Sequence, residues 1–252
     1  MFCVAWIPFV VPPAVTVKPT FETRQRFERR IDRDFRSDLP DGKNDLFTRV
    51  RAGAELSMGS SWSGAVQFQL ASDAIWTDAR NFSTENRDVS QAYVRHRSGT
   101  TTITVGRQKM AFGSERLIGN LEWANVARAF DGVRVSTAQW DVFAMKIGVN
   151  SPVLPEARLL GGALRWGAGE SMLVFKHDEP ASGDVDVTTV GHRAARKVGG
   201  LDLDYEAAVQ FGETAGKNQR AWAVHVGASK RIDPKTRVFA EVNAASGGGD
   251  AD

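Results

Sequence analysis

Arginine side chains recur in pairs, two residues apart, in the first hundred residues of the chain. The pairs are Arg24 with Arg26, Arg49 with Arg51, and Arg95 with Arg97. Residues two apart in a β-strand point to the same face, so each pair would present two guanidinium groups together. The six side chains could form a positive track for a polyanion. The alternative is that they pair with nearby acids and only solvate an interior, the candidates being Glu22, Glu28, Glu55, Asp202, Asp204 and Glu206.

A long charged segment lies between two strand-like stretches and reads GRQKMAFGSERLIGNLEWANVARAFDGVRV over residues 106–135. Its middle has no helical or strand period over roughly twenty residues, and a loop of that length in a compact domain is usually functional. A loop that folds into a pore would bring opposite charges together at the narrowest point, here Glu115, Arg116, Arg128 and Asp131. Asp131 could instead cap the turn into its strand. Arg107 and Arg134, at the two ends of the segment, complete the residues expected to line a pore; a solvated surface loop is the alternative.

From Thr20 onward, apolar and polar residues alternate with the period of two that is typical of strands with one apolar face. No helix is predicted. The clearest alternation lies in residues 201–211, where acids oppose large apolar side chains. About thirteen strands are predicted, at residues 20–30, 46–57, 64–72, 89–97, 101–105, 130–135, 140–150, 159–166, 171–178, 186–194, 201–211, 222–230 and 237–244.

The connections between these segments separate a membrane barrel from a soluble β-sandwich, because both classes show alternation. Long and short connections alternate along most of the chain, as in barrels with short periplasmic turns and long external loops. An arginine on the lipid side costs roughly 2–4 kcal/mol near the membrane midplane, so Arg24 and Arg26 are expected to face the lumen. The sequence therefore predicts an all-β protein, a transmembrane antiparallel β-barrel of the up-and-down, outer-membrane type.

The same alternation assigns side chains to the lipid side of the wall. In residues 140–150, Phe143, Met145, Ile147 and Val149 are predicted to point outward. Four tryptophans near strand ends suit the aromatic belt of a membrane barrel, with ordinary packing as the alternative: Trp76, Trp123, Trp140 and Trp222.

Composition argues against several classes of function. Basic and acidic residues nearly balance, 32 against 30, and no basic block stands apart, so no nucleic-acid partner is predicted. One cysteine, Cys3, and scattered histidines indicate neither a disulfide framework nor a metal site, and no cofactor motif occurs. The protein is not predicted to be an enzyme. A hydrolase on the barrel wall would need a serine paired with an outward histidine, and His96 is the histidine whose strand position points outward.

The two ends of the chain are read separately from the middle. Residues 1–16 are apolar and interrupted by prolines, which suggests either the end of a signal peptide or a misassigned start. Residues 17–252 are assigned to one partial barrel domain. Bacterial single-chain barrels have even strand numbers and no open edge, so an odd number predicts that C-terminal strands are missing.

The central segment resembles the alginate export proteins of the Gram-negative outer membrane. The similarity is strongest at GRQ (106–108), FGSERLIGN (112–120), WAN (123–125) and RAFDG (128–132), with weaker similarity at residues 91–93, 203–210 and 245–247. Membership would imply a monomeric barrel of about eighteen strands with an arginine-rich lumen that passes the polyuronate alginate. The chain lacks the C-terminal aromatic residue by which the barrel-assembly machinery recognises such proteins.

The function expected from these observations is an outer-membrane channel for export or diffusion of an anionic polysaccharide through an arginine-rich lumen. Its partners would be outer-membrane lipid, the polysaccharide or small anions, and the assembly machinery. A general anion-preferring porin for small solutes is the first alternative. A soluble β-rich carbohydrate-binding module is the second, and it would need a dry core between two sheets.

Overall fold

The structure is a computed structural model that describes residues 14–30, 43–75, 82–148, 157–180 and 183–246. All regular secondary structure in these ranges is β-strand. None of the described residues forms a helix that could cross a membrane. Predictions for Trp76 and Val149 fall outside the described residues. The first strand starts at Val15, two residues before the predicted start of the barrel domain.

The thirteen predicted strands are all present, which confirms the all-β class. In chain order they are β1 (Val15–Arg30), β2 (Lys43–Met58), β3 (Trp62–Ile75), β4 (Phe82–Ser98), β5 (Thr101–Gln108), β6 (Ala129–Ser136), β7 (Trp140–Gly148), β8 (Arg158–Trp166), β9 (Gly169–Asp178), β10 (Val185–Val198), β11 (Leu201–Thr214), β12 (Lys217–Arg231) and β13 (Arg237–Ala245).

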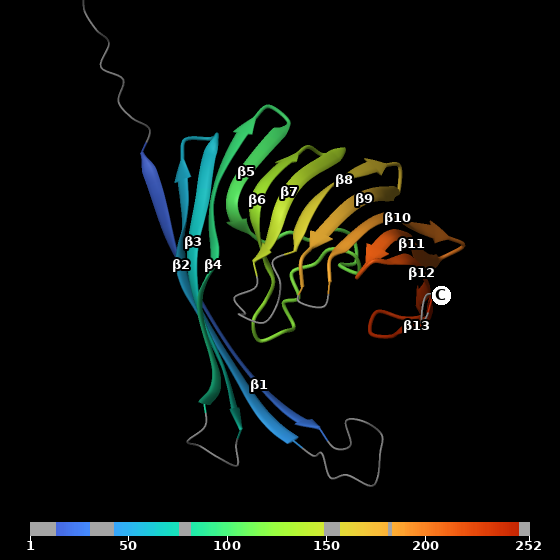
Figure 1. Ribbon diagram of the computed structural model, residues 1–252, viewed down its shortest axis with the longest axis horizontal. Coiled ribbons are helices and arrows are strands. Elements are labelled where there is room, and N and C mark those ends of the chain that lie inside the picture. Colours follow the sequence, from blue (N-terminus) through green and yellow to red (C-terminus); the bar gives the residue numbers. More distant parts are fainter. Residues whose placement is uncertain (1–13, 31–42, 76–81, 149–156, 181–182, 247–252) are drawn as a thin grey trace, which may run out of the picture.

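Each strand pairs antiparallel with its neighbour in the sequence, so the sheet order is simply β1 to β13. The sheet curls strongly, and the segment between β5 and β6 lies on its concave side (Figure 1). In the described part of the chain, β1 and β13 each pair with one neighbour. This is the up-and-down connectivity that the alternation of long and short loops predicted.

Strand lengths differ from the prediction at the long-loop end of the sheet. The first four strands have 14 to 17 residues, and β3 and β4 extend into residues 73–88, which were predicted to be a loop. At the other end, tight turns contain glycines with positive φ, such as Gly59 (61°), Gly99 (56°) and Gly167 (57°). Glycine has no Cβ to clash in this conformation, so the turns can be short. The β11–β12 turn, Ala215–Gly216, is also short although it lies at the long-loop end.

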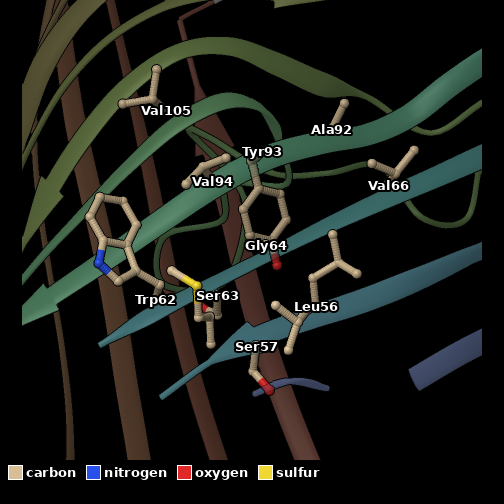
Figure 2. A pocket seen from close by; sticks show the side chains of 12 residues that line it. Leu56, Ser57, Trp62, Ser63, Gly64, Val66, Ala92, Tyr93, Val94 and Val105 are labelled. Atoms are coloured by element: carbon tan, nitrogen blue, oxygen red, sulfur yellow. The ribbon is translucent and has the colours of Figure 1, made fainter. Parts of the chain in front are cut away.

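The convex face of the sheet is apolar over β2 to β5. Cross-strand pairing places Leu56, Gly64, Val94 and Val105 side by side on this face, and their larger side chains are exposed. A groove of about 450 Å³ runs between them and Trp62. Figure 2 shows these apolar side chains around it. This is the face that the sequence assigns to lipid.

A buried apolar core lies on the concave face, between β7–β9 and the β5–β6 segment. The prediction that Phe143, Met145 and Ile147 point outward is wrong. Phe143 and Met145 are 2% and 4% exposed and lie in this core, and Ile147 packs against it, whereas Val142 of the same strand is 49% exposed. Strand β7 is apolar on both faces. The larger side chains face inward because the β5–β6 segment covers them.

Candidate functional site

The β5–β6 loop, residues 109–128, is the segment that the sequence singled out, and it lies inside the curled sheet (Figure 1). Two backbone hydrogen bonds shape it: Phe112 N donates to Ile118 O at 3.1 Å, and Arg128 N donates to Asn120 O at 2.7 Å. Glu115 has φ of 63° and its Oε2 accepts from Asn120 N at 3.0 Å. Glu115 therefore stabilises the loop internally.

One side of the loop is apolar and packs on three strands. Met110, Phe112 and Ile118 are buried, with the rings of Phe112 and Phe143 5.5 Å apart. We call the strand residues beneath them the apolar wall: Phe143 and Met145 of β7, Leu159 of β8, and Met172 and Val174 of β9. Close packing of this kind fixes the loop mainly through apolar contacts, and the Arg134 guanidinium adds a cation–π contact 5.2 Å from the centre of the Phe112 ring.

The other side of the loop is polar and meets β1 and β2. Glu122 is the centre of the contact: its Oε2 lies 2.9 Å from Arg51 Nη1 and 3.3 Å from Arg49 Nη2, and its Oε1 lies 2.5 Å from Lys109 Nζ. Arg51 is 1% exposed and also donates from Nε to Gln69 Oε1 at 2.8 Å. Sequence reasoning did not select Glu122 or Lys109.

Main-chain carbonyls of the loop bind the arginines of β1. Arg24 donates to Glu122 O at 2.5 Å and to Ala124 O at 2.8 Å, and Arg26 donates to Trp123 O. The Arg26 guanidinium also lies 4.4 Å from the centre of the Trp123 ring, a cation–π contact. Trp123 is therefore part of the loop contact, and its assignment to the outer aromatic belt is wrong. Arg24, Arg26, Arg49 and Arg51 together are called the arginine wall.

A third contact joins the loop to β11. Ser114 Oγ donates to Glu206 Oε2, and Arg116 Nη1 lies 3.2 Å from the same oxygen. The loop thus contacts the sheet on opposite sides of its concave face, at β1–β2 and at β11. Arg116, which was predicted to meet Arg128 and Asp131 at a constriction, meets Glu206 instead.

Arg107 and Asp131 are paired with each other outside the loop. Arg107 Nε lies 2.7 Å from Asp131 Oδ1, and its Nη1 lies 2.9 Å from Asp88 Oδ1. The ladder between β4 and β5 ends at Ala92 and Arg107, so Arg107 links three strands where β4 and β5 separate. Neither residue joins Glu115 and Arg116, so the predicted cluster of four loop charges is not formed.

The remaining predicted residues are dispersed. Arg134 Nε lies 2.5 Å from Asp141 Oδ1, and Arg95 Nε donates to Thr104 Oγ1 at 3.2 Å. Arg97 is exposed beside the tight turn at residues 99–100. Arg128 is half-buried, and its side chain has no hydrogen bond or ion pair with any described residue. Burial lowers the pKa of its guanidinium.

The loop acid at the arginine wall is held in its charged form. Burial alone would raise the pKa of Glu122, but Lys109 and Arg51 outweigh burial and the pKa lies below its ordinary value of 4.5. At neutral pH, Glu122 is therefore a carboxylate, and the wall keeps its ion pairs.

One serine–histidine pair lies on the convex face. Ser171 Oγ is 2.9 Å from His192 Nδ1, in strand positions that share a face with the exposed Leu173 and Val190, so His96 is not alone in pointing outward. Among the described residues, no carboxylate binds the second nitrogen of His192, the contact that orients a catalytic imidazole. The described residues also contain no group of three or more His, Cys, Asp or Glu placed to hold a metal ion.

The chain was compared with known protein families, curated proteins and solved structures. The profile of the alginate export family matches residues 17–158, more than half of the chain. No curated protein matches the chain. Several solved structures from Pseudomonas aeruginosa are similar, and three of them are described here. OpdO has a TM-score of 0.63 at 14% identity and aligns over 92% of this chain and 65% of its own.

The other two are OccK2 (OpdF), solved with glucuronate, and the outer membrane protein OprD. OccK2 has a TM-score of 0.59 at 11% identity over 92% of this chain and 64% of its own; for OprD the values are 0.51, 10%, 86% and 54%. At such identities the likeness shows the fold, which is that of an outer-membrane β-barrel. The chain spans less than two thirds of the length of each of these proteins.

Proposed function

The chain belongs to the alginate export family of the bacterial outer membrane, and we propose that the protein is a channel through which anionic saccharides, alginate-like polyuronates among them, cross that membrane. The curled sheet provides the wall and the β5–β6 loop narrows the lumen. The chemistry required is passage and weak binding, without covalent steps.

The observation that carries the proposal is uncompensated positive charge beside the loop. In the described part of the chain, Arg24 donates only to main-chain carbonyls of the loop, so no carboxylate neutralises it by direct contact. The adjoining ion pairs combine three cations with two carboxylates: Arg49, Arg51, Lys109, Glu22 and Glu122. A positive potential in a narrow, low-dielectric space raises the local concentration of anions.

The engagement of the arginine wall with the loop also favours weak binding. A conducting path needs several sites that release their ligand readily. Arginines already bonded to the loop attract an anion through their remaining field and hold it less tightly than free guanidinium groups would. A uronate is a reasonable ligand, since the structurally similar OccK2 was solved with glucuronate.

The test is ion selectivity of the protein in a planar bilayer. We expect the reversal potential in a salt gradient to indicate anion preference, and an oligouronate to block the current. Arg24→Ala should reduce both effects. Arg220→Ala, an exposed residue on the convex side of β12, is the matched control and should leave both unchanged.

Two outcomes would separate the alternatives. Anion preference without any block by oligouronates would favour a general anion-preferring porin for small solutes. A cation-selective current that is indifferent to Arg24→Ala would contradict the proposal while leaving the barrel fold intact.

A further inference from the structure

A second cavity, of about 290 Å³, lies between the β5–β6 loop and strands β11–β13. Its floor consists of two rows of side chains on the concave face. Cross-strand pairing aligns Ala208, Ala223 and Ala245 in one row. Two residues along the strands, the same pairing aligns a polar row: Glu206, His225 and Asn243. The cavity exists because the three alanine side chains are short, and the polar row forms one of its edges.

The loop supplies a partly unused cation to this cavity. Arg116 lines it, and only its Nη1 is engaged, with Ser114 Oγ at 2.7 Å and Glu206 Oε2 at 3.2 Å. Among the described residues, its Nε and Nη2 have no partner. A guanidinium with two free nitrogens can bind a planar carboxylate through a pair of parallel hydrogen bonds.

The polar row offers acceptors and donors in fixed orientations. Glu206 uses only Oε2 for the loop, which leaves Oε1 as an acceptor within the described residues. His225, 4% exposed, lies between Asp204 Oδ2 at 2.9 Å and Asn243 Oδ1 at 2.8 Å. This contact turns the Asn243 amide nitrogen away from the ring; one of its two N–H groups donates to Glu241 Oε1 at 3.4 Å, and the other remains available.

We propose that this cavity is a binding subsite for a single uronate ring. Its volume is near the lower end of the range of roughly 300–1,000 Å³ for ligand pockets, which suits one ring. Arg116 would bind the carboxylate, Glu206 and Asn243 the hydroxyl groups, and the alanine row would contact the C–H face of the sugar. The inference rests on the proposed function and adds a defined site beside the loop, apart from the arginine wall.

Binding can be measured separately from conduction. Saturation-transfer NMR of the detergent-solubilised protein with glucuronate should show contact with the sugar, and glucose should bind more weakly because it has no carboxylate. Arg116→Gln should remove this difference between the two sugars. Equal binding of glucuronate and glucose by the unmodified protein would overturn the assignment of Arg116.

A matched pair of substitutions tests the location. Ala223→Leu fills the cavity and should weaken glucuronate binding about tenfold, equivalent to about 1.4 kcal/mol. Ala221→Leu adds the same bulk on the same face of β12, two residues away and outside the cavity lining, and should not weaken it. Asn243→Ala removes a polar group without adding bulk and should also weaken binding. Equal affinity in Ala223→Leu and Ala221→Leu would place the sugar elsewhere.

The outcomes also separate this inference from the proposed function. Anion-selective conduction with oligouronate block, combined with glucuronate binding that ignores Ala223→Leu and Asn243→Ala, would reject the subsite and keep the channel. Glucuronate binding sensitive to both variants in a protein that conducts no anions would keep the subsite and reject the channel.

Discussion

The arginine wall and the apolar wall hold the same loop by different forces. On β7–β9 the loop packs through buried apolar side chains. On β1–β2 the contacts are ion pairs and hydrogen bonds to carbonyl oxygens, and the partner carboxylate of Glu122 is 39% exposed. Apolar burial involves no titrating group and depends less on pH and moderate salt, whereas ion pairs with a partly exposed carboxylate respond to both. The loop is therefore fixed along one side and adjustable along the other.

Loss of an apolar contact should have the largest effect on the loop and the barrel together. Phe143→Ala removes a ring that is 2% exposed and should lower the free energy of unfolding by about 3–5 kcal/mol. Val142→Ala, on the convex face of the same strand, is the control and should cost much less. Urea unfolding of the detergent-solubilised protein measures both. Equal losses would show that the loop does not cover β7.

Loss of the central arginine should free the polar side of the loop without unfolding the sheet. Arg51→Ala removes the hydrogen bond to Gln69 and the shorter of the two arginine ion pairs of Glu122, which should cost about 1–3 kcal/mol of loop anchoring. The reporter is the rate of thiol labelling of Trp123→Cys in a Cys3→Ser background, which should rise. Labelling of Leu117→Cys, near the apolar wall, should rise less. If both sites respond equally, the two sides of the loop do not act separately.

Acidification should give the smallest effect, confined to the arginine wall. The pKa of Glu122 in the folded protein is below its ordinary 4.5, so its contribution is complete above pH 4.5 and is lost as the pH falls through the lower, folded value. The labelling rate at position 123, divided by that of a free thiol at the same pH to remove the titration of the thiol itself, should therefore be constant from pH 7 to 4.5 and rise below that range. Glu122→Gln should abolish this rise. A change between pH 7 and 5 would assign the effect to another group.

Much of the fold could be predicted from alternation because most strands have one polar face and one apolar face. Strands β1 and β2 are good examples, and their arginines share the concave face with Glu22. Strand β7 failed because both of its faces are apolar. The sequence of β7, WDVFAMKIG, does not indicate which of its two apolar faces is covered. The loop that covers Phe143 lies more than ten residues earlier, and the contact between them is tertiary.

The candidate site was predicted less well than the fold. The loop itself was identified from its length, but the partners of its charges depend on how it crosses the sheet. Glu122 looked like one acid among several, although an excess of arginines on β1 and β2 signals that a carboxylate must come from elsewhere. Asp131 was assigned to the constriction and Arg107 to the pore lining, whereas the β5–β6 ladder pairs the two directly.

The sequential order of the strands has a consequence for how the pore acquires its width. Every strand pairs with its neighbour in the chain, so hairpins can form one after another with little loop-closure entropy. The loop is different: Arg24 contacts Ala124 across 100 residues, and Glu206 contacts Ser114 across 92. Contacts at such separation form late, because they need both distant strands in place. Assembly should therefore pass through a wide barrel before the loop docks and narrows it.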